Sequence, residues 1–189
     1  MSILDFGFND VDTFLKGIEN AMPLMEVAID ELGLSDHVLG HALREGISPH
    51  IALGLSGEHL DALFTIGLHA MQAGEIAKAQ IVFQKLVTLK SIDERYWYAL
   101  GTSMQMQDRV AEAARAYIIA LGLKATDVEG YLRLGECLLA AKEVNEALAC
   151  FQMASSLCDD GHGDESQKQM AERYVAHTNQ RQKSEGVAE

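Results

Sequence analysis

Apolar residues between Leu60 and Ala154 recur at the three-to-four-residue spacing of amphipathic helices, and this helical pattern itself repeats along the chain. Three glycines mark the repetition, because Gly67, Gly101 and Gly135 are spaced 34 residues apart. Other residue types recur at fixed distances from each glycine, which predicts three copies of one helical hairpin. The recurring sets are Leu63, Trp97 and Tyr131; Ile66, Leu100 and Leu134; Ala79, Ala113 and Ala147; Phe83, Tyr117 and Phe151; and Leu86, Ala120 and Ala154.

This period and these residue types are the signature of the tetratricopeptide repeat. The glycine of the first helix and the alanine of the second allow close approach, and the aromatic residue is expected to fill the space between one repeat and the next. One hairpin cannot bury its own apolar face, so neighbours must stack. The sequence therefore predicts an all-α fold, a right-handed superhelix of three repeats at about 60–93, 94–127 and 128–161, within a domain covering 57–160.

The repeat boundaries are expected at turn and capping residues. Turns between the two helices of each repeat are predicted at Gly74, at Asp108 and near Lys142. Two Ser/Thr-x-x-Glu capping boxes predict the starts of repeats two and three, and the matching position before repeat one has histidine in place of the acid, which predicts a weaker start. The three pairs are Ser91 with Glu94, Thr126 with Glu129, and Ser56 with His59.

Amphipathic segments also flank the repeats. Residues 1–56 contain short helical patterns with more apolar residues than they can hide alone, so they must pack on the repeats, on each other or on a second copy of the chain. After an Asp- and Gly-rich break, about 165–183 reads as a polar helix with one apolar stripe. Region 162–189 is therefore expected to cover the last repeat and to fray from Ser184.

Composition narrows the class of protein. The hydrophobic fraction of 48% is ample for a core, and the net charge of −13 argues against nucleic acid as a partner. No apolar run reaches the roughly 18–20 residues of a membrane span, and the N-terminus lacks a signal-type pattern. The three cysteines, Cys137, Cys150 and Cys158, suit packing in a reducing cytosol. A cytoplasmic protein without direct membrane insertion is expected.

No arrangement of residues points to catalysis. His37 and His41 have a spacing that can bind a metal, but no third ligand is identifiable nearby. His162 lies in an acidic stretch that lacks the twelve-residue calcium pattern, so a solvated turn is expected there. Phosphate-binding and nucleophile motifs are also missing. We therefore expect no enzyme, no cofactor and no metal.

What is left for function is a surface for recognition. In this repeat the first helix lines the concave side, and the positions not needed for packing are mostly apolar with a few polar edges. Such a groove suits an extended hydrophobic peptide, unless the N-terminal helices or a dimer mate cover it. The predicted groove residues are Asp61, Phe64, Leu68 and Met71; Arg95, Tyr98, Thr102 and Gln105; and Glu129, Leu132, Glu136 and Leu139.

The entry to repeat one carries a family resemblance. It reads Leu43-Arg44-Glu45-Gly46, then Gly54-Leu55-Ser56, then Leu60, Leu63 and Phe64. This resembles the class II chaperones of type III secretion translocators, the SycD/LcrH-like group. Later stretches are also similar to the family, and the resemblance covers about residues 42–158. Those stretches are Val82-Phe83-Gln84, Asp93-Glu94-Arg95-Tyr96 and Gly135-Glu136-Cys137-Leu138.

The resemblance implies a cytoplasmic, homodimeric chaperone that binds the secreted, pore-forming translocator proteins and holds an extended segment of each in the groove. It also implies dimer contacts in the N-terminal helical region. Three alternatives stay open, namely a generic scaffold for two folded proteins, a chaperone of a needle or filament subunit, and an enzyme. The implied dimer residues are Val38, Leu39, Leu43, Ile51 and Leu55.

Overall fold

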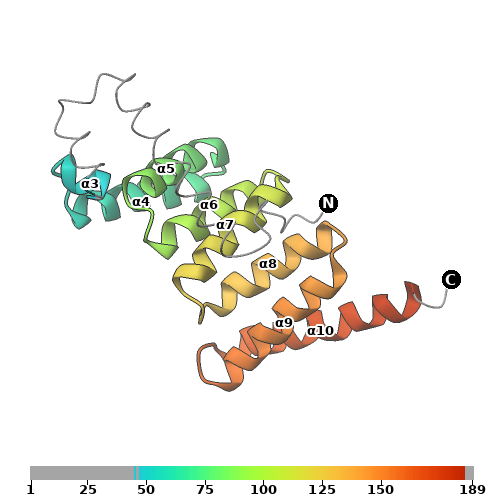
Figure 1. Ribbon diagram of the computed structural model, residues 1–189. Helices are drawn as coiled ribbons and strands as arrows, with labels where there is room; N and C mark the ends of the chain where they lie inside the picture. Colours follow the sequence, from blue (N-terminus) through green and yellow to red (C-terminus); the bar gives the residue numbers. More distant parts are fainter. Residues whose placement is uncertain (1–44, 46, 186–189) are drawn as a thin grey trace.

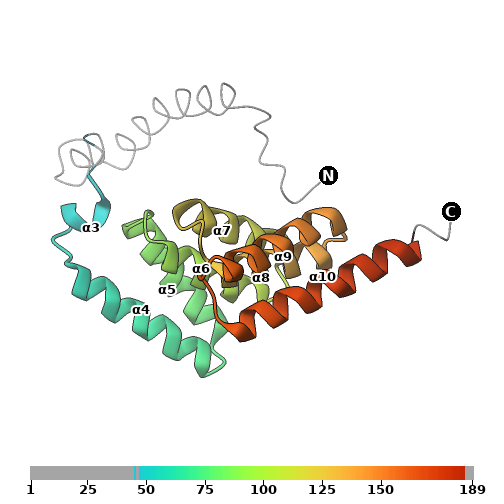
Figure 2. The same cartoon turned by 90° about the horizontal axis from the view of Figure 1, so that it is seen from below.

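The computed structural model describes residue 45 and residues 47–185, with side-chain surroundings up to residue 180. Every helix and turn expected before residue 45 lies outside this part, as do residues 186–189. The described helices stack as successive hairpins, with the last helix at the C-terminal end of the stack (Figures 1 and 2). They are α3 Pro49–Ala52, α4 Gly57–Gln72, α5 Ile76–Leu89, α6 Glu94–Gln105, α7 Val110–Leu123, α8 Val128–Ala140, α9 Val144–Asp159 and α10 Glu165–Glu185.

The predicted all-α repeat fold is confirmed. Helices α4 to α10 pack chiefly on their neighbours in sequence, as a stack of hairpins requires, and the short helix α3 packs on α5. Helix α10 packs mainly on α9 and also touches α8. Helix α10 continues past Ser184 to Glu185, and the fraying of the C-terminal end stays a prediction. None of the described helices combines the length and apolar character that crossing a bilayer requires.

The repeated glycines explain how closely the two helices of a hairpin approach. A Cβ atom built on Gly67 would stand 2.5 Å from Cε1 of Phe83, and one on Gly135 would stand 2.5 Å from Cε1 of Phe151. The ring of the second helix thus lies over the glycine of its own repeat. In repeat three the ring also stacks on Tyr174 of α10, with ring centroids 4.5 Å apart. The same aromatic position therefore closes the hairpin and receives the next helix.

The turn inside each repeat has the same backbone geometry. Gly74, Asp108 and Lys142 all adopt positive φ, at 78°, 59° and 64°. The predicted turns are confirmed, and the left-handed residue falls at the same repeat position three times. Glycine adopts this conformation without strain, whereas residues with a Cβ atom adopt it at a cost.

Helix starts differ from the predicted capping boxes. Ser56 and His59 form a reciprocal cap on α4, because the His59 N–H donates to Ser56 Oγ and the Ser56 N–H donates to His59 Nδ1 at 3.0 Å. The weak start predicted there is therefore wrong. Helices α6 and α8 begin one or two residues later than predicted, with Asp93 and Asp127 as the N-cap residues. The boxes predicted from Ser91 with Glu94 and from Thr126 with Glu129 are absent for that reason.

The core consists of two clusters of buried side chains. One joins α4, α5 and α6 around Leu60, Phe83 and Tyr96. The other joins α7, α8 and α9 around Tyr117 and Phe151, and α10 contributes to it. The hydrophobic interior therefore continues from the first hairpin to the C-terminal helix, as expected of a stack whose repeats cannot bury their faces alone.

Candidate functional site

Helices α4 and α6, together with the start of α8, surround a hollow of about 380 Å³. Its floor is apolar, and charged side chains from α6 and from the α7–α8 connection form its rim. Such a hollow can hold one or two apolar side chains of a ligand, with polar groups placed to orient it. The floor consists of Phe64, Leu68, Met71, Tyr98 and Ala99, and the remaining lining residues are Glu94, Arg95, Thr102, Lys124, Asp127 and Glu129.

The aromatic side chains of the floor are fixed from behind by the core. The ring of Phe64 lies 5.8 Å from that of Phe83 and 5.5 Å from that of Tyr96, both in tilted orientations. The ring of Tyr98 lies 5.5 Å from that of Tyr117. Aromatic pairs in this geometry attract beyond their area burial. The floor is therefore preorganised, and a ligand does not have to order it.

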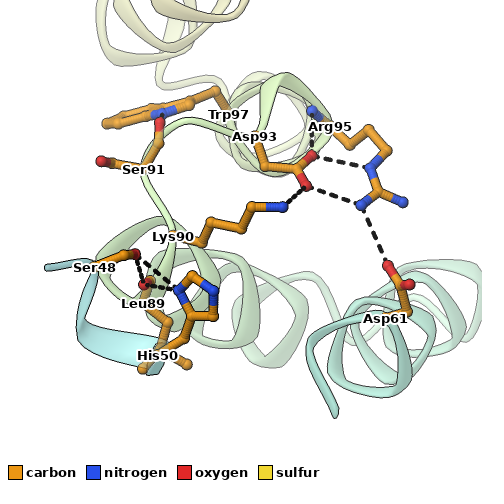
Figure 3. Close-up of polar contacts among 9 residues, drawn as sticks. All are labelled: Ser48, His50, Asp61, Leu89, Lys90, Ser91, Asp93, Arg95 and Trp97. Carbon is orange, nitrogen blue, oxygen red and sulfur yellow. Dashed lines mark hydrogen bonds and ion pairs between the residues drawn. The ribbon is translucent and has the colours of Figure 1, made fainter. Parts of the chain in front are cut away.

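A buried carboxylate anchors the rim at the start of α6. Asp93 is only 6% exposed and accepts hydrogen bonds from Arg95 Nε at 2.9 Å, from Arg95 Nη2 at 2.8 Å and from Lys90 Nζ at 3.2 Å (Figure 3). The hydrogen bond from Arg95 holds the pKa of Asp93 below its ordinary value. The two-point contact fixes the guanidinium plane of Arg95 as well as its position.

The same guanidinium links the first two repeats across the hollow. Arg95 Nη2 lies 3.2 Å from Asp61 Oδ1 on α4, and both side chains are exposed (Figure 3). The guanidinium carbon also lies 5.6 Å from the ring centroid of Phe64 and 5.5 Å from that of Tyr96. Arg95 thus covers one edge of the aromatic floor by cation–π contact. The positive charge of Arg95 is therefore balanced by the carboxylates of Asp93 and Asp61.

Further along the stack, polar side chains tie α6, α8 and α10 together. Glu136 accepts hydrogen bonds from Gln105 Nε2 at 3.1 Å, from Arg133 Nη1 at 3.2 Å and from the Tyr174 hydroxyl at 2.6 Å. The Tyr117 hydroxyl donates to Gln105 Oε1 at 2.8 Å. Burial, together with the contact to Glu136, raises the pKa of Tyr174 to about 12. Gln105 and Glu136 are therefore engaged with each other and with α10.

The structure brings together seven of the twelve predicted groove residues at one hollow. Asp61 does not line the hollow, but it forms an ion pair with the lining residue Arg95. Leu139 is half-buried against the core, and Leu132 is a core residue with 1% exposure that offers a ligand no surface. The prediction that Leu132 lines the groove is therefore wrong, because its side chain is buried in the core cluster of α7, α8 and α9. The seven lining residues are Phe64, Leu68, Met71, Arg95, Tyr98, Thr102 and Glu129.

Sequence reasoning missed four lining residues. Glu94 and Ala99 lie beside predicted positions on α6, whereas Lys124 and Asp127 lie in the connection between α7 and α8. These last two stand 34 residues after Lys90 and Asp93, which do not line the hollow, so the repeat pattern gives no signal for them.

The other predicted residues have varied surroundings. Val38, Leu39 and Leu43 lie outside the described residues, as does the His37 and His41 pair. Ile51 is 61% exposed, and Leu55 is half-buried against the first core cluster. Their role in a dimer stays a prediction.

The three cysteines are free thiols. Cys137 is buried, whereas Cys150 and Cys158 are partly buried. Burial raises the pKa of Cys137 to about 12 and that of Cys150 to about 11. Thiols with pKa values this high stay protonated at neutral pH, so packing describes them better than reactivity.

Translocator chaperones of type III secretion are among the known proteins to which this chain is similar. No family model matches the chain. The low calcium response locus protein H of Yersinia pestis is 26% identical over 106 residues, which are 56% of this chain and 63% of that protein. The translocator chaperone SycD of Yersinia enterocolitica superposes with a TM-score of 0.66 at 21% identity, covering 68% of this chain and 89% of SycD.

A second solved structure extends the likeness to a chaperone with a bound partner. PcrH in complex with the chaperone-binding region of PopB superposes with a TM-score of 0.59 at 27% identity, covering 65% of this chain and 97% of PcrH. The fold is that of the translocator chaperones. The resemblance of this chain to the class II group of type III secretion is thereby confirmed.

Proposed function

We propose that the protein is a cytoplasmic chaperone that keeps the pore-forming translocator substrates of a type III secretion system soluble. It does so by holding an extended segment of each substrate in the hollow between α4 and α6. The observation that carries this proposal is the preorganised apolar floor, formed on the fold of a chaperone that has been solved with its partner's binding region. Its role is binding rather than catalysis, and it needs no cofactor.

The chemistry of the hollow fits such a client. A protein that later enters a membrane exposes apolar segments that aggregate in water unless they are shielded. Phe64, Leu68, Met71 and Tyr98 offer apolar contact, and the net charge of −13 keeps the complex soluble. An extended segment needs no folding before it binds, so it can be released to the secretion machinery while still unfolded.

We also propose that the chaperone is a homodimer through its N-terminal region, including Ile51. The high exposure of Ile51 in a single copy supports this assignment. A solved structure of SycD describes a dimer of that protein. Sedimentation is expected to give a dimer at micromolar concentration and a shift toward monomer on Ile51→Asp. A wild-type protein that sediments only as a monomer would contradict this part of the proposal.

The test of client binding uses two substitutions on one helix. Leu68 is 36% exposed and lines the hollow, whereas Ile66 is 56% exposed and does not line it. Each is changed to Asp in the full chain, which is then co-expressed with a hydrophobic translocator of the secretion system encoded in the same genome. We expect wild type and Ile66→Asp to keep the translocator soluble and to co-purify with it, and Leu68→Asp to lose it.

Circular dichroism of both variants controls for folding. Because both side chains are exposed, helicity and melting temperature are expected to stay close to wild type. Equal co-purification with both variants would show that the hollow is not the binding site. A complex that forms only when the translocator is already folded would favour a scaffold for folded proteins instead.

A further inference from the structure

Repeats two and three carry almost the same charged residues around the start of their first helix, but the sign of one charge is reversed. Repeat two has Lys, then Asp three residues later, then Arg two residues after that. Repeat three has the same Lys and Asp, but a Glu replaces the Arg, and this Glu lines the hollow. The two sets, 34 residues apart, are Lys90, Asp93 and Arg95, and Lys124, Asp127 and Glu129.

In repeat two the arginine neutralises the aspartate. Asp93 accepts two hydrogen bonds from the Arg95 guanidinium and one from Lys90, and it is almost fully buried. A carboxylate bound in this way attracts no further cation, because its charge and its lone pairs are already used.

In repeat three no such arginine is present. Glu129 accepts a hydrogen bond from Arg133 Nε at 3.0 Å, one turn further along α8, and Lys124 Nζ lies 4.0 Å from Glu94 Oε1. Within the described part of the chain, no basic side chain hydrogen-bonds to Asp127. Burial raises the pKa of Asp127 although Lys124 and nearby backbone N–H groups act to lower it, so its ionised form is compensated less than that of Asp93.

Asp127 and Glu129, here called the acidic edge, both line the hollow beside its apolar floor. We propose that the acidic edge binds a Lys or Arg side chain of the client segment whose apolar residues occupy the floor. This inference rests on the proposed function and defines the chemistry of its ligand. The ligand is an extended segment in which a basic residue stands close to the apolar anchors.

Charge complementarity favours this ligand over an acidic one. The lining contains three carboxylates and two basic groups, and one of the basic groups, Arg95, already bonds to Asp93 and to Asp61. Glu129 is paired with Arg133, so Asp127 is the carboxylate of the acidic edge to which no basic side chain of the described residues hydrogen-bonds. An acidic client residue would be repelled by Asp127. A basic client residue would supply the charge that Arg95 supplies one repeat earlier. Partial exclusion of water by the apolar floor strengthens that attraction.

The experiment selects ligands without assuming a sequence. Twelve-residue peptides displayed on phage are selected on the immobilised full chain, and recovered peptides are synthesised with a fluorophore. Each is also made with its Lys or Arg changed to Gln, and binding is measured by fluorescence anisotropy. The proteins are wild type, Asp127→Asn and Glu129→Arg. The matched control is Glu112→Gln, which removes one carboxylate on α7, outside the hollow.

We expect the selected peptides to combine apolar residues with Lys or Arg. The change to Gln is expected to weaken binding about fivefold to wild type and to Glu112→Gln, but less than twofold to Asp127→Asn. Glu129→Arg is expected to abolish the preference, because it recreates the arrangement of repeat two. The preference should also shrink as salt rises.

Two results would overturn the inference. One is a set of selected peptides that lack an excess of basic residues, and the other is a loss on Gln substitution that is equal for wild type and Asp127→Asn. In either case, peptides that bind wild type and fail to bind Leu68→Asp leave the proposed function intact. If the peptides bind Leu68→Asp and wild type with equal affinity, the hollow is not the binding site and the proposed function fails.

Discussion

Gly135 of α8 faces Phe151 of α9 so closely that a methyl group on the glycine would stand 2.5 Å from ring atom Cε1 and 2.7 Å from Cζ. The same contact recurs between Gly67 and Phe83. Two helices of a hairpin can approach this far only because the first helix lacks a side chain at the crossing point. The contact sets the spacing of each hairpin and hence the position of the first helix, which lines the hollow.

Replacing these glycines by alanine is expected to destabilise the fold by steric overlap. Gly67→Ala and Gly135→Ala should each lower the free energy of unfolding by about 1–3 kcal/mol, after an offset of up to about 1 kcal/mol from higher helix propensity. Gly101→Ala should lower it less, because its methyl group would stand 3.0 Å from Tyr117 Cε1. Denaturant unfolding followed by circular dichroism measures the difference. A loss at Gly101 that equals or exceeds the loss at Gly135 would contradict the steric explanation.

Substitutions at the turn position with positive φ are expected to change stability in opposite directions, depending on whether glycine is introduced or removed. Lys142 has φ of 64°, so Lys142→Gly removes a strained conformation and should raise stability by about 0.5–1 kcal/mol. Gly74 has φ of 78°, so Gly74→Ala introduces that strain and should lower stability by about 1 kcal/mol. Thermal melting of both variants tests the pair. Shifts of the same sign would show that something other than backbone conformation controls this position.

The two N-cap aspartates respond differently to pH. Hydrogen bonding from Arg95 lowers the pKa of Asp93 in the folded state, so its contribution to stability is complete above its ordinary pKa near 4 and disappears as the pH falls through the lowered value. Asp93→Asn should therefore reduce stability by about 1–3 kcal/mol at pH 7, and by much less only at a pH below the lowered pKa of Asp93.

Asp127 provides the matched comparison, because burial raises its pKa. Its ionised form is disfavoured by folding at neutral pH, and this penalty is relieved as the pH falls through the raised value. Asparagine keeps the N-cap function, so Asp127→Asn is expected to change stability at pH 7 by no more than about 0.5 kcal/mol in either direction. Urea midpoints at pH 7 separate the two residues, and equal losses at that pH would refute this difference.

Much of the fold could be predicted from the sequence because each hairpin packs mainly on its neighbours. A fixed period then maps directly onto repeated contacts, as Gly67 with Phe83 and Gly135 with Phe151 illustrate. Helix starts were harder to predict locally. Both Ser91 and Asp93 are good N-cap residues, and the hydrogen bonds of Asp93 with Lys90 and Arg95 favour the second.

The hollow was predictable only in part, because equivalent repeat positions do not have equivalent neighbours. Phe64, Tyr98 and Leu132 share one repeat position, yet Leu132 is buried in the cluster to which Ala171 of α10 belongs. The hydrogen bond from Tyr174 to Glu136 joins residues 38 positions apart, and no repeat pattern indicates it. The last repeat differs from the others because a capping helix, and not another repeat, follows it.

In the described part of that capping helix, one side-chain polar atom is buried without a hydrogen-bond partner. Thr178 is fully buried on α10, and its hydroxyl has no hydrogen-bond partner among the described residues. Thr178→Val keeps the shape and removes the buried hydroxyl, so it is expected to raise the free energy of unfolding by about 1 kcal/mol. Thr178→Ser is the matched control, because it keeps the hydroxyl and loses the methyl group, and it should lower stability by about 1 kcal/mol. Thermal and urea unfolding of both variants measure the difference, and a valine variant less stable than wild type would mean that the hydroxyl does have a partner.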